Sequence, residues 1–202
     1  MSLELLNALS SLGTLLVVAA ATVAAIVQLR HLRNSNHIVA INELRESTED
    51  PEFLKAAHFV AAGLSAKLQD REFRRQIGDR SSRTEENRPL IDQTIRIGNF
   101  YEIFGSLVRS GFVDRDLALE IWFNIIIQNW AMLEPVVALL RRSSSEGTWE
   151  NFEYITALAQ DYSKAHPKGT YPATTRRLKI TDPWLETDRG DLTATSGELA
   201  AR

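Results

Sequence analysis

The stretch Leu15-Leu16-Val17-Val18-Ala19-Ala20-Ala21-Thr22-Val23-Ala24-Ala25-Ile26-Val27 is the centre of an N-terminal segment, residues 5–29, that carries no charged side chain. As an α-helix this segment is roughly 37 Å long, which exceeds the hydrocarbon core of a bilayer, about 30 Å thick. A helix also satisfies all of its own backbone hydrogen bonds in lipid, which a single extended segment cannot do. The sequence therefore predicts one transmembrane anchor at residues 1–29.

A cleaved signal peptide is the alternative interpretation of this segment. Such a peptide has a basic N-terminal region and an apolar core of about 7–15 residues. Here the leader carries Glu4 and no basic residue, and the apolar run is longer than that core. An uncleaved anchor is favoured, although its Ala-rich part offers small residues of the kind that signal peptidases cut.

The residues on either side of the anchor predict its orientation. Arg30, His31 and Arg33 follow the apolar segment directly, whereas Glu4 precedes it. Basic residues next to a span are retained on the cytoplasmic side. We therefore expect a single-pass protein whose N-terminus is periplasmic and whose C-terminal domain is cytoplasmic.

Small residues on the anchor would allow another helix to approach it closely. Ala20 and Ala24, like Ala21 and Ala25, have small-xxx-small spacing, and Gly13 adds a further small position. The alternative is that alanine only fills the helix as a weakly hydrophobic residue. The expected partners are the lipid bilayer and either a second copy of the chain or another membrane protein.

The rest of the chain is expected to form a cytoplasmic helical domain at residues 30–165 and an irregular, partly disordered tail at residues 166–202. Hydrophobic residues make up 44% of the sequence and charged residues 24%, which are ordinary values for a globular protein. A net charge of −3 gives no support for nucleic acid as a partner. The absence of cysteine excludes disulfides, thiolate metal sites and a Cys nucleophile.

Capping residues and apolar periodicity predict an all-α bundle of about four to five helices that continues from the anchor. Asp50, Asp70 and Asp114 are N-cap residues, and Pro51 suits a first helical turn. Gly111 suits a helix C-terminus. Helices are expected to follow each cap and to cover residues 89–109, 114–142 and 149–165, and residues 78–88 are expected to be a mobile loop.

The helix at residues 89–109 carries two glycines at the edge of its apolar stripe. Gly98 and Gly105 lie seven residues apart. Each glycine inside a helix costs about 1 kcal/mol relative to alanine. Two of them on one line predict a groove in which another helix packs closely, with Glu102 and Arg109 at its flanks.

The helix at residues 114–142 has an apolar middle, residues 121–140, which by length could be a second membrane span. Asn124, Gln128 and Glu134 fall inside it, and a charge at the centre of a span costs about 3 kcal/mol. We therefore expect the central buried helix of the domain, with a membrane-embedded segment as the alternative. The residues expected to be buried polar groups are Glu102, Arg109, Asn124, Gln128, Glu134 and Arg142.

Catalytic motifs are not apparent. The four histidines, His31, His37, His58 and His166, lack the spacing of metal ligands, and the chain has neither a Gly-rich phosphate loop nor a nucleophile elbow. We expect no metal, no cofactor and no catalytic residue. Glu134 is expected to form an ion pair with an arginine, and a proton or ligand contact is the alternative.

Several short motifs together resemble a known bacterial family. They are Phe100-Tyr101-Glu102, Arg109-Ser110-Gly111-Phe112-Val113-Asp114, Trp130-Ala131-Met132-Leu133-Glu134-Pro135, Arg141-Arg142 and Trp149-Glu150-Asn151-Phe152-Glu153-Tyr154. Across roughly residues 10–165 the chain is similar to the family called domain of unknown function 4760. The inserted Ser110 departs from the family's Arg-Gly turn. The resemblance implies a membrane-tethered helical module of the bacterial inner membrane, with no assigned activity.

The first hypothesis for function is a non-enzymatic accessory or scaffold protein, which self-associates or joins a larger inner-membrane complex through protein–protein interaction. The second is a membrane-tethered signalling or phage-defence effector. The third is an enzyme that uses Glu102 or Glu134 as an acid or base.

Overall fold

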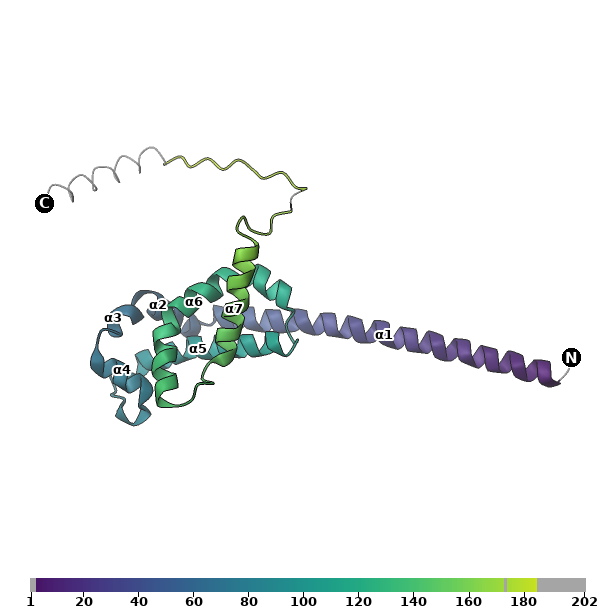
Figure 1. Cartoon of the computed structure of the whole chain (residues 1–202), viewed down its shortest axis with the longest axis horizontal. Helices are drawn as coiled ribbons and strands as arrows, with labels where there is room; N and C mark the ends of the chain where they lie inside the picture. The colour runs from purple at the N-terminus through teal and green to yellow at the C-terminus, as the bar shows by residue number, and fades with distance from the viewer. Residues whose placement is uncertain (1–2, 173, 185–202) are drawn as a thin grey trace. The chain divides into compact units, whose positions relative to one another are not determined.

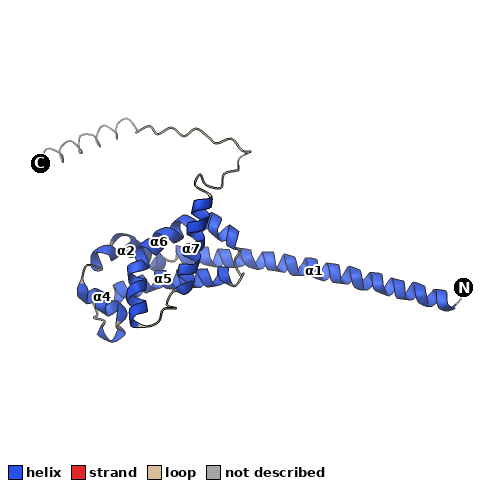
Figure 2. Ribbon diagram, viewed as in Figure 1, coloured by secondary structure: helices blue, strands red, loops and turns tan. Residues whose placement is uncertain are grey.

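The computed structural model describes residues 3–172 and 174–184, except for the side chains of residues 3–11 and 29–38. All regular secondary structure in these residues is helical, as Figure 2 shows, which confirms the all-α fold class. Contacts divide the chain into residues 1–167 and residues 168–202. The helices are α1 (Leu3–Glu49), α2 (Pro51–Ala62), α3 (Leu64–Lys67), α4 (Arg71–Gly78), the 3₁₀ turn η1 (Arg80–Ser82), α5 (Arg88–Arg109), α6 (Arg115–Ser143) and α7 (Glu150–Ala165).

Helix α1 runs without a break from the apolar segment to the helical bundle (Figure 1). Every residue from 12 to 28 is exposed. At the other end, Leu44 is buried, and Ala40 and Ile41 pack against the core beside it. One helix therefore carries a fully exposed apolar segment and a strip that belongs to the core. The basic residues expected to orient the anchor, at positions 30–33, lie outside the described side chains.

Three aspartates begin helices as the sequence predicts. The Oδ1 atom of Asp50 accepts hydrogen bonds from two backbone N–H groups of the first turn of α2, at 2.9 and 3.0 Å. Asp70 and Asp114 cap α4 and α6 in the same way, at 2.8 and 2.9 Å. Gly111 follows the last turn of α5 with a φ of 72°, a left-handed conformation that glycine adopts without strain. These local signals define the helix boundaries.

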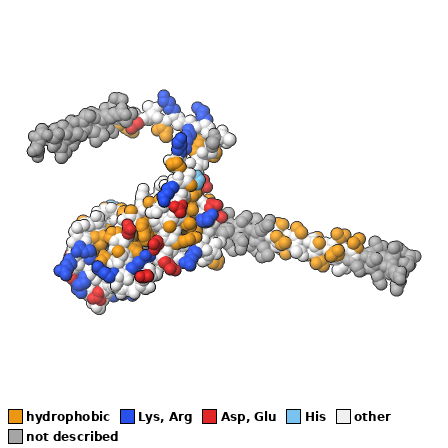
Figure 3. Space-filling model, viewed as in Figure 1, with side chains coloured by type: hydrophobic (Ala, Val, Ile, Leu, Met, Phe, Trp, Pro, Cys, Tyr) orange, Lys and Arg blue, Asp and Glu red, His pale blue; other side chains and the backbone are white. Residues whose placement is uncertain are grey.

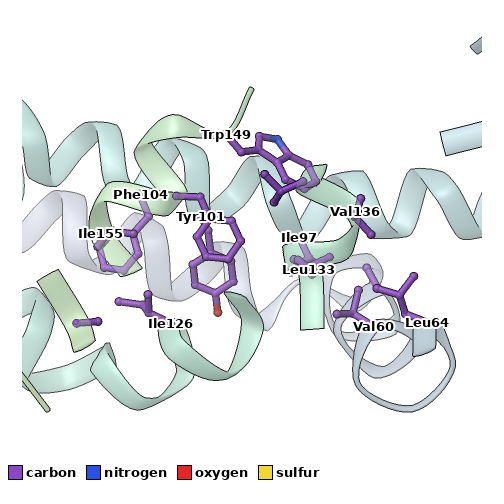
Figure 4. Packing of buried hydrophobic residues seen from close by; sticks show 14 of the residues in the cluster. Val60, Leu64, Ile97, Tyr101, Phe104, Ile126, Leu133, Val136, Trp149 and Ile155 are labelled. Carbon is purple, nitrogen blue, oxygen red and sulfur yellow. The ribbon is translucent and has the colours of Figure 1, made fainter. Parts of the chain in front are cut away.

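The core lies where α5, α7, α6 and α2 meet, and Figure 4 shows part of it. Phe152 of α7 is fully buried in this core. It stacks on Tyr101 of α5 at 4.8 Å and meets the edge of Trp130 of α6 at 5.0 Å. The other large, fully buried side chains include Phe73, Phe104, Leu64, Ile77, Ile91, Ile97, Ile126, Leu133 and Ile155.

Helix α6 corrects the expectation of a central buried helix. Its inner face, with Ile126 and Leu133, is fully buried. Leu117, Ile121 and Ile125 are 38%, 52% and 48% exposed, so the bundle does not cover α6 on all sides. By length and composition α6 is apolar enough to cross a membrane, but its inner face is part of the protein core.

The segment at residues 78–88, expected to be a mobile loop, contains the 3₁₀ turn η1 and is hydrogen-bonded to the end of α4. Gln76, at the end of α4, is fully buried, and its Oε1 accepts hydrogen bonds from the backbone N–H and the hydroxyl of Thr84 at 3.2 and 3.3 Å. The guanidinium Nε of Arg83 donates to the carbonyl of Gln76 at 3.2 Å. One buried amide side chain thus holds the segment against the bundle.

The tail has no helix among its described residues, 166–172 and 174–184, in agreement with the irregular structure expected there. The Thr175 N–H donates to the carbonyl of Pro172 at 3.0 Å and closes a turn there. The disorder expected for the last ten residues falls on residues 185–202, which lie outside those described.

Candidate functional site: the clasp between α5 and α7

The two glycines of α5 form the predicted groove, and the start of α7 fills it. A Cβ on Gly105 would overlap the backbone carbonyl of Asn151, and a Cβ on Gly98 would overlap the ring of Trp149. Both glycines are buried. The close approach requires residues without side chains, and the neighbouring helix belongs to the same chain.

Trp149 is the residue that α7 inserts over Gly98. Its side chain is 5% exposed, and its indole Nε1 donates to the Oδ1 of Asn99 at 3.0 Å. Its backbone has a φ of 55°, a left-handed conformation that bulky residues rarely adopt. Such backbone strain persists where surrounding contacts impose it, and here the glycine seat and the Asn99 hydrogen bond supply those contacts.

Glu102 caps α7 from the neighbouring helix. The N-cap residue of α7 is Trp149, whose side chain has no oxygen to accept from the first-turn N–H groups. The Glu102 carboxylate does so instead: Oε2 accepts from the N–H groups of Asn151 and Phe152 at 2.9 and 3.0 Å, and Oε1 accepts from Asn151 Nδ2 at 2.7 Å. A negative charge at a helix N-terminus is further stabilised by the helix dipole.

We call this contact the clasp and define it as residues 149–152 together with five residues of α5: Gly98, Asn99, Glu102, Gly105 and Arg109. Two arginines, Arg109 and Arg141, lie at its sides. Arg109 Nη1 lies 3.3 Å from Glu150 Oε1 and donates to Asn151 Oδ1 at 3.2 Å. Arg141, at the end of α6, donates through Nε to the Thr148 carbonyl at 3.0 Å, and its Nη2 lies 2.7 Å from the Glu153 carboxylate. The loop before α7 is thereby held on both sides.

The polar groups of the clasp satisfy one another. Both oxygens of Glu102 accept hydrogen bonds from α7. The neighbouring Tyr101 hydroxyl is buried, and this burial raises the pKa of Tyr101 well above its usual range, while a hydrogen bond with Asn129 acts in the opposite direction. A carboxylate that already binds three donors and a phenol that stays protonated suit a structural joint better than proton transfer.

The other predicted buried polar residues lie elsewhere, and their predicted burial is wrong. Asn124, Gln128 and Glu134 are exposed on α6. Arg142 is exposed near the end of α6. Arg109 is exposed as well, at the rim of the clasp, and Glu102 is half-buried within it.

The small residues of α1 lie on the exposed apolar segment. A Cβ on Gly13 would have open space around it, and all four alanines of the predicted pairs (Ala20, Ala21, Ala24 and Ala25) are exposed. Their predicted contacts with a second helix therefore stay a prediction. His31 and His37 lie outside the described side chains. Among the residues that are described, no group of three His, Cys, Asp or Glu side chains is placed to hold a metal ion.

Two hollows adjoin the bundle near α1. The larger, about 840 Å³, is an open groove between the end of α1 and α5, with Glu43, Glu46, Asp50 and Asp92 on its rim. The smaller, about 230 Å³, is lined mainly by apolar and aromatic side chains of α1, α2, α5 and α6. Neither includes Glu102 or Glu134 among its lining residues.

Sequence reasoning found the glycines, Glu102 and Arg109 but missed Trp149, Asn99 and Asn151. One signal could have found the capping contact. The helix predicted to begin near Trp149 starts at a residue whose side chain has no hydrogen-bond acceptor, which is visible in the sequence. A helix start without an available capping oxygen requires an acceptor from elsewhere in the fold.

The motifs at residues 100–102, 109–114 and 149–154 thus meet in space: the first and last form the clasp, and the second carries its rim arginine and ends α5. A scan against protein-family models matches the model described as Domain of unknown function (DUF4760) over residues 15–158. No curated protein and no solved structure matches the chain. The family match covers most of the chain, from within the apolar segment of α1 to the middle of α7, and the chain therefore belongs to the DUF4760 family.

Proposed function

We propose that this protein is a single-pass membrane protein of the bacterial inner membrane whose cytoplasmic helical domain serves as an accessory or scaffold unit and performs no catalysis. The observation that carries the proposal is the continuity of α1. One helix joins an exposed apolar segment to the bundle core, so an anchor in lipid would hold the bundle directly at the membrane surface.

The described part of the apolar segment is exposed on all sides. Leu15, Val17, Val23 and Val27 are each at least 60% exposed, and Figure 3 shows apolar side chains all along this part of the helix. A helix that is apolar all round needs an apolar environment. The family match begins at residue 15, within this segment, which supports an anchor that is retained rather than removed.

Two surfaces support a role in assembly. The first is the pair of small-xxx-small patterns on α1, at Ala20 with Ala24 and at Ala21 with Ala25, which suit close helix contact in lipid. The second is on α6, where Leu117 and Ile121 are exposed one turn apart. Exposed apolar surface of this kind is typical of protein–protein interfaces.

The clasp supports the absence of catalysis. Its carboxylate, its indole and its amide are all engaged in positioning α7. An acid or base in an enzyme must be within reach of a substrate proton, and each Glu102 oxygen is already directed at α7.

Membrane extraction of the full chain tests the anchor. The protein should stay in the membrane fraction after washing with alkaline carbonate, and its intact mass should include residues 1–29. Alkaline phosphatase fused after Arg202 should be inactive, because the cytoplasm prevents formation of its disulfides. Release by carbonate, loss of the N-terminal segment or an active phosphatase would each contradict the proposed topology.

A pair of matched variants tests self-association. The double variant Ala20→Leu, Ala24→Leu replaces the small residues at which a second helix could approach α1 closely. The control, Val17→Leu with Val27→Leu, changes two exposed positions of α1 that already carry large side chains. Cross-linking of the full chain in mild detergent should lose dimers with the alanine variant alone. Equal cross-linking of both variants would rule out α1 as the contact, and a co-purifying protein would favour a mixed complex.

A further inference from the structure

The tail carries a short segment, residues 168–184, whose charge is opposite to that of the bundle. It has four basic side chains and one carboxylate, whereas acidic residues outnumber basic ones between residues 39 and 167. Its large apolar side chains lie in solvent: Leu178 is 72% exposed, Ile180 91% and Trp184 67%. The described tail in Figure 3 shows the basic side chains along its length. The segment thus presents positive charge and apolar surface together.

Local contacts gather part of this segment into a basic and aromatic turn. The guanidinium carbon of Arg177 lies 5.1 Å from the centre of the Tyr171 ring, and its Nη2 donates to the Lys168 carbonyl at 2.5 Å. The Tyr171 hydroxyl donates to the carbonyl of Arg176 at 3.3 Å. The one carboxylate of the segment, Asp182, accepts from the Trp184 N–H at 2.9 Å. Arg177 and Tyr171 are therefore held as a unit.

We propose that residues 168–184 bind the anionic lipid surface of the membrane that holds α1. Lys and Arg side chains are attracted to anionic headgroups, and Tyr and Trp favour the boundary between headgroups and acyl chains. Leu178 and Ile180 alternate with the basic residues 176, 177 and 179, so that apolar groups enter the boundary beside the charges that bind it. The partner is thus a bilayer surface with phosphate-bearing, negatively charged headgroups.

The proposal rests on the proposed function, since an anchor in lipid would tether the segment to the same bilayer. Each basic side chain near an anionic surface adds roughly fivefold to membrane partitioning. Tethering in the same molecule raises the effective concentration of the surface to the millimolar range or above. The segment should therefore bind the membrane more strongly in the anchored protein than as a free peptide.

The absence of cysteine allows a clean test in the full chain. Thr181→Cys introduces the single thiol of the protein, which can be labelled with an environment-sensitive fluorophore. The labelled protein is reconstituted into vesicles of phosphatidylcholine alone, or of phosphatidylcholine containing one quarter phosphatidylglycerol. We expect a blue shift of the emission in the anionic vesicles only, and its reversal by high salt, which screens charge at a membrane surface.

Two triple variants distinguish the effect of positive charge on residues 168–184 from the effect of positive charge elsewhere in the protein. Arg176→Gln, Arg177→Gln and Lys179→Gln should lower partitioning of the segment by about a hundredfold and abolish the shift. Arg71→Gln, Arg80→Gln and Arg88→Gln remove the same charge from exposed positions of the bundle and should leave the shift unchanged. Equal spectra in both vesicle types, or a shift that survives the tail variant, would overturn the proposal. So would a shift that follows protein density instead of lipid charge, because the partner would then be another copy of the chain.

These measurements test the proposed anchor and the proposed lipid binding of residues 168–184 independently. Retention of the protein on neutral vesicles after an alkaline wash reports the anchor alone, whereas the response of the label to lipid charge reports the tail. An anchor failure would release the chain from neutral vesicles and leave the dependence on lipid charge to be measured by flotation.

Discussion

Replacing Gly105 with alanine should destabilise the bundle, although alanine is the better helix former. A new Cβ at this position overlaps the carbonyl of Asn151, which is backbone and cannot rotate away. Helices α5 and α7 must then separate. The change tests whether the groove of α5 holds α7 as closely as the structure shows.

The expected magnitude combines three effects. Alanine in place of a helical glycine contributes about 1 kcal/mol of stability. Overpacking typically costs about 1–3 kcal/mol. Separation of the helices also lengthens the bonds from the Asn151 and Phe152 N–H groups to Glu102, and a hydrogen bond to a charged group contributes about 1.5–3 kcal/mol. A net loss of roughly 2 kcal/mol in the free energy of unfolding is expected.

Urea unfolding of the full chain in mild detergent, followed by tryptophan fluorescence, measures this loss. With a dependence on urea of about 2 kcal/mol per molar, the midpoint should fall by about 1 M. Ser106→Ala, at the adjacent exposed position of α5, is the matched control and should change the midpoint little. A midpoint for Gly105→Ala at or above that of the original chain would refute the close packing of α5 on α7.

Two further predictions concern carboxylates. Glu102→Ala should lower the free energy of unfolding by about 2–4 kcal/mol because the N–H groups of Asn151 and Phe152 lose their acceptor; Glu102→Gln should lose less, since its amide oxygen can still accept, and equal urea midpoints for the two variants would contradict the capping role. The hydrogen bond from Arg75, with a smaller contribution from Gln76, lowers the pKa of Glu72 from 4.5 to about 2. A lowered pKa in the folded state stabilises the fold above pH 4.5 and ceases to do so as the pH falls toward 2. The difference in urea midpoint between the original chain and Glu72→Gln should therefore shrink over that range, and a constant difference would contradict the assignment.

Local features of the sequence were sufficient to predict where α2, α4 and α6 begin. Asp50, Asp70 and Asp114 cap helices because the groups they bind are two or three residues away along the chain. The apolar stripe of α5 and the spacing of Gly98 and Gly105 likewise predicted a close approach by another helix, since a helix repeats its faces at a known period. The apolar segment of α1 was evident from composition alone.

Tertiary structure decided which groups meet across long stretches of chain. The residues that fill the glycine groove, Trp149 and Asn151, lie about fifty residues later in the chain. The local spacing of residues in α5 gives no information about them. The predicted burial of Glu134 was wrong for the same reason. The sequence of an apolar helix does not show which of its sides the other helices cover. Burial and capping across helices depend on the packing of the whole bundle, whereas helix period and N-caps depend on a few adjacent residues. The sequence alone therefore determined the all-α class, the capped helix starts and the apolar helix, and only the fold determined that Glu102 holds α7 in place.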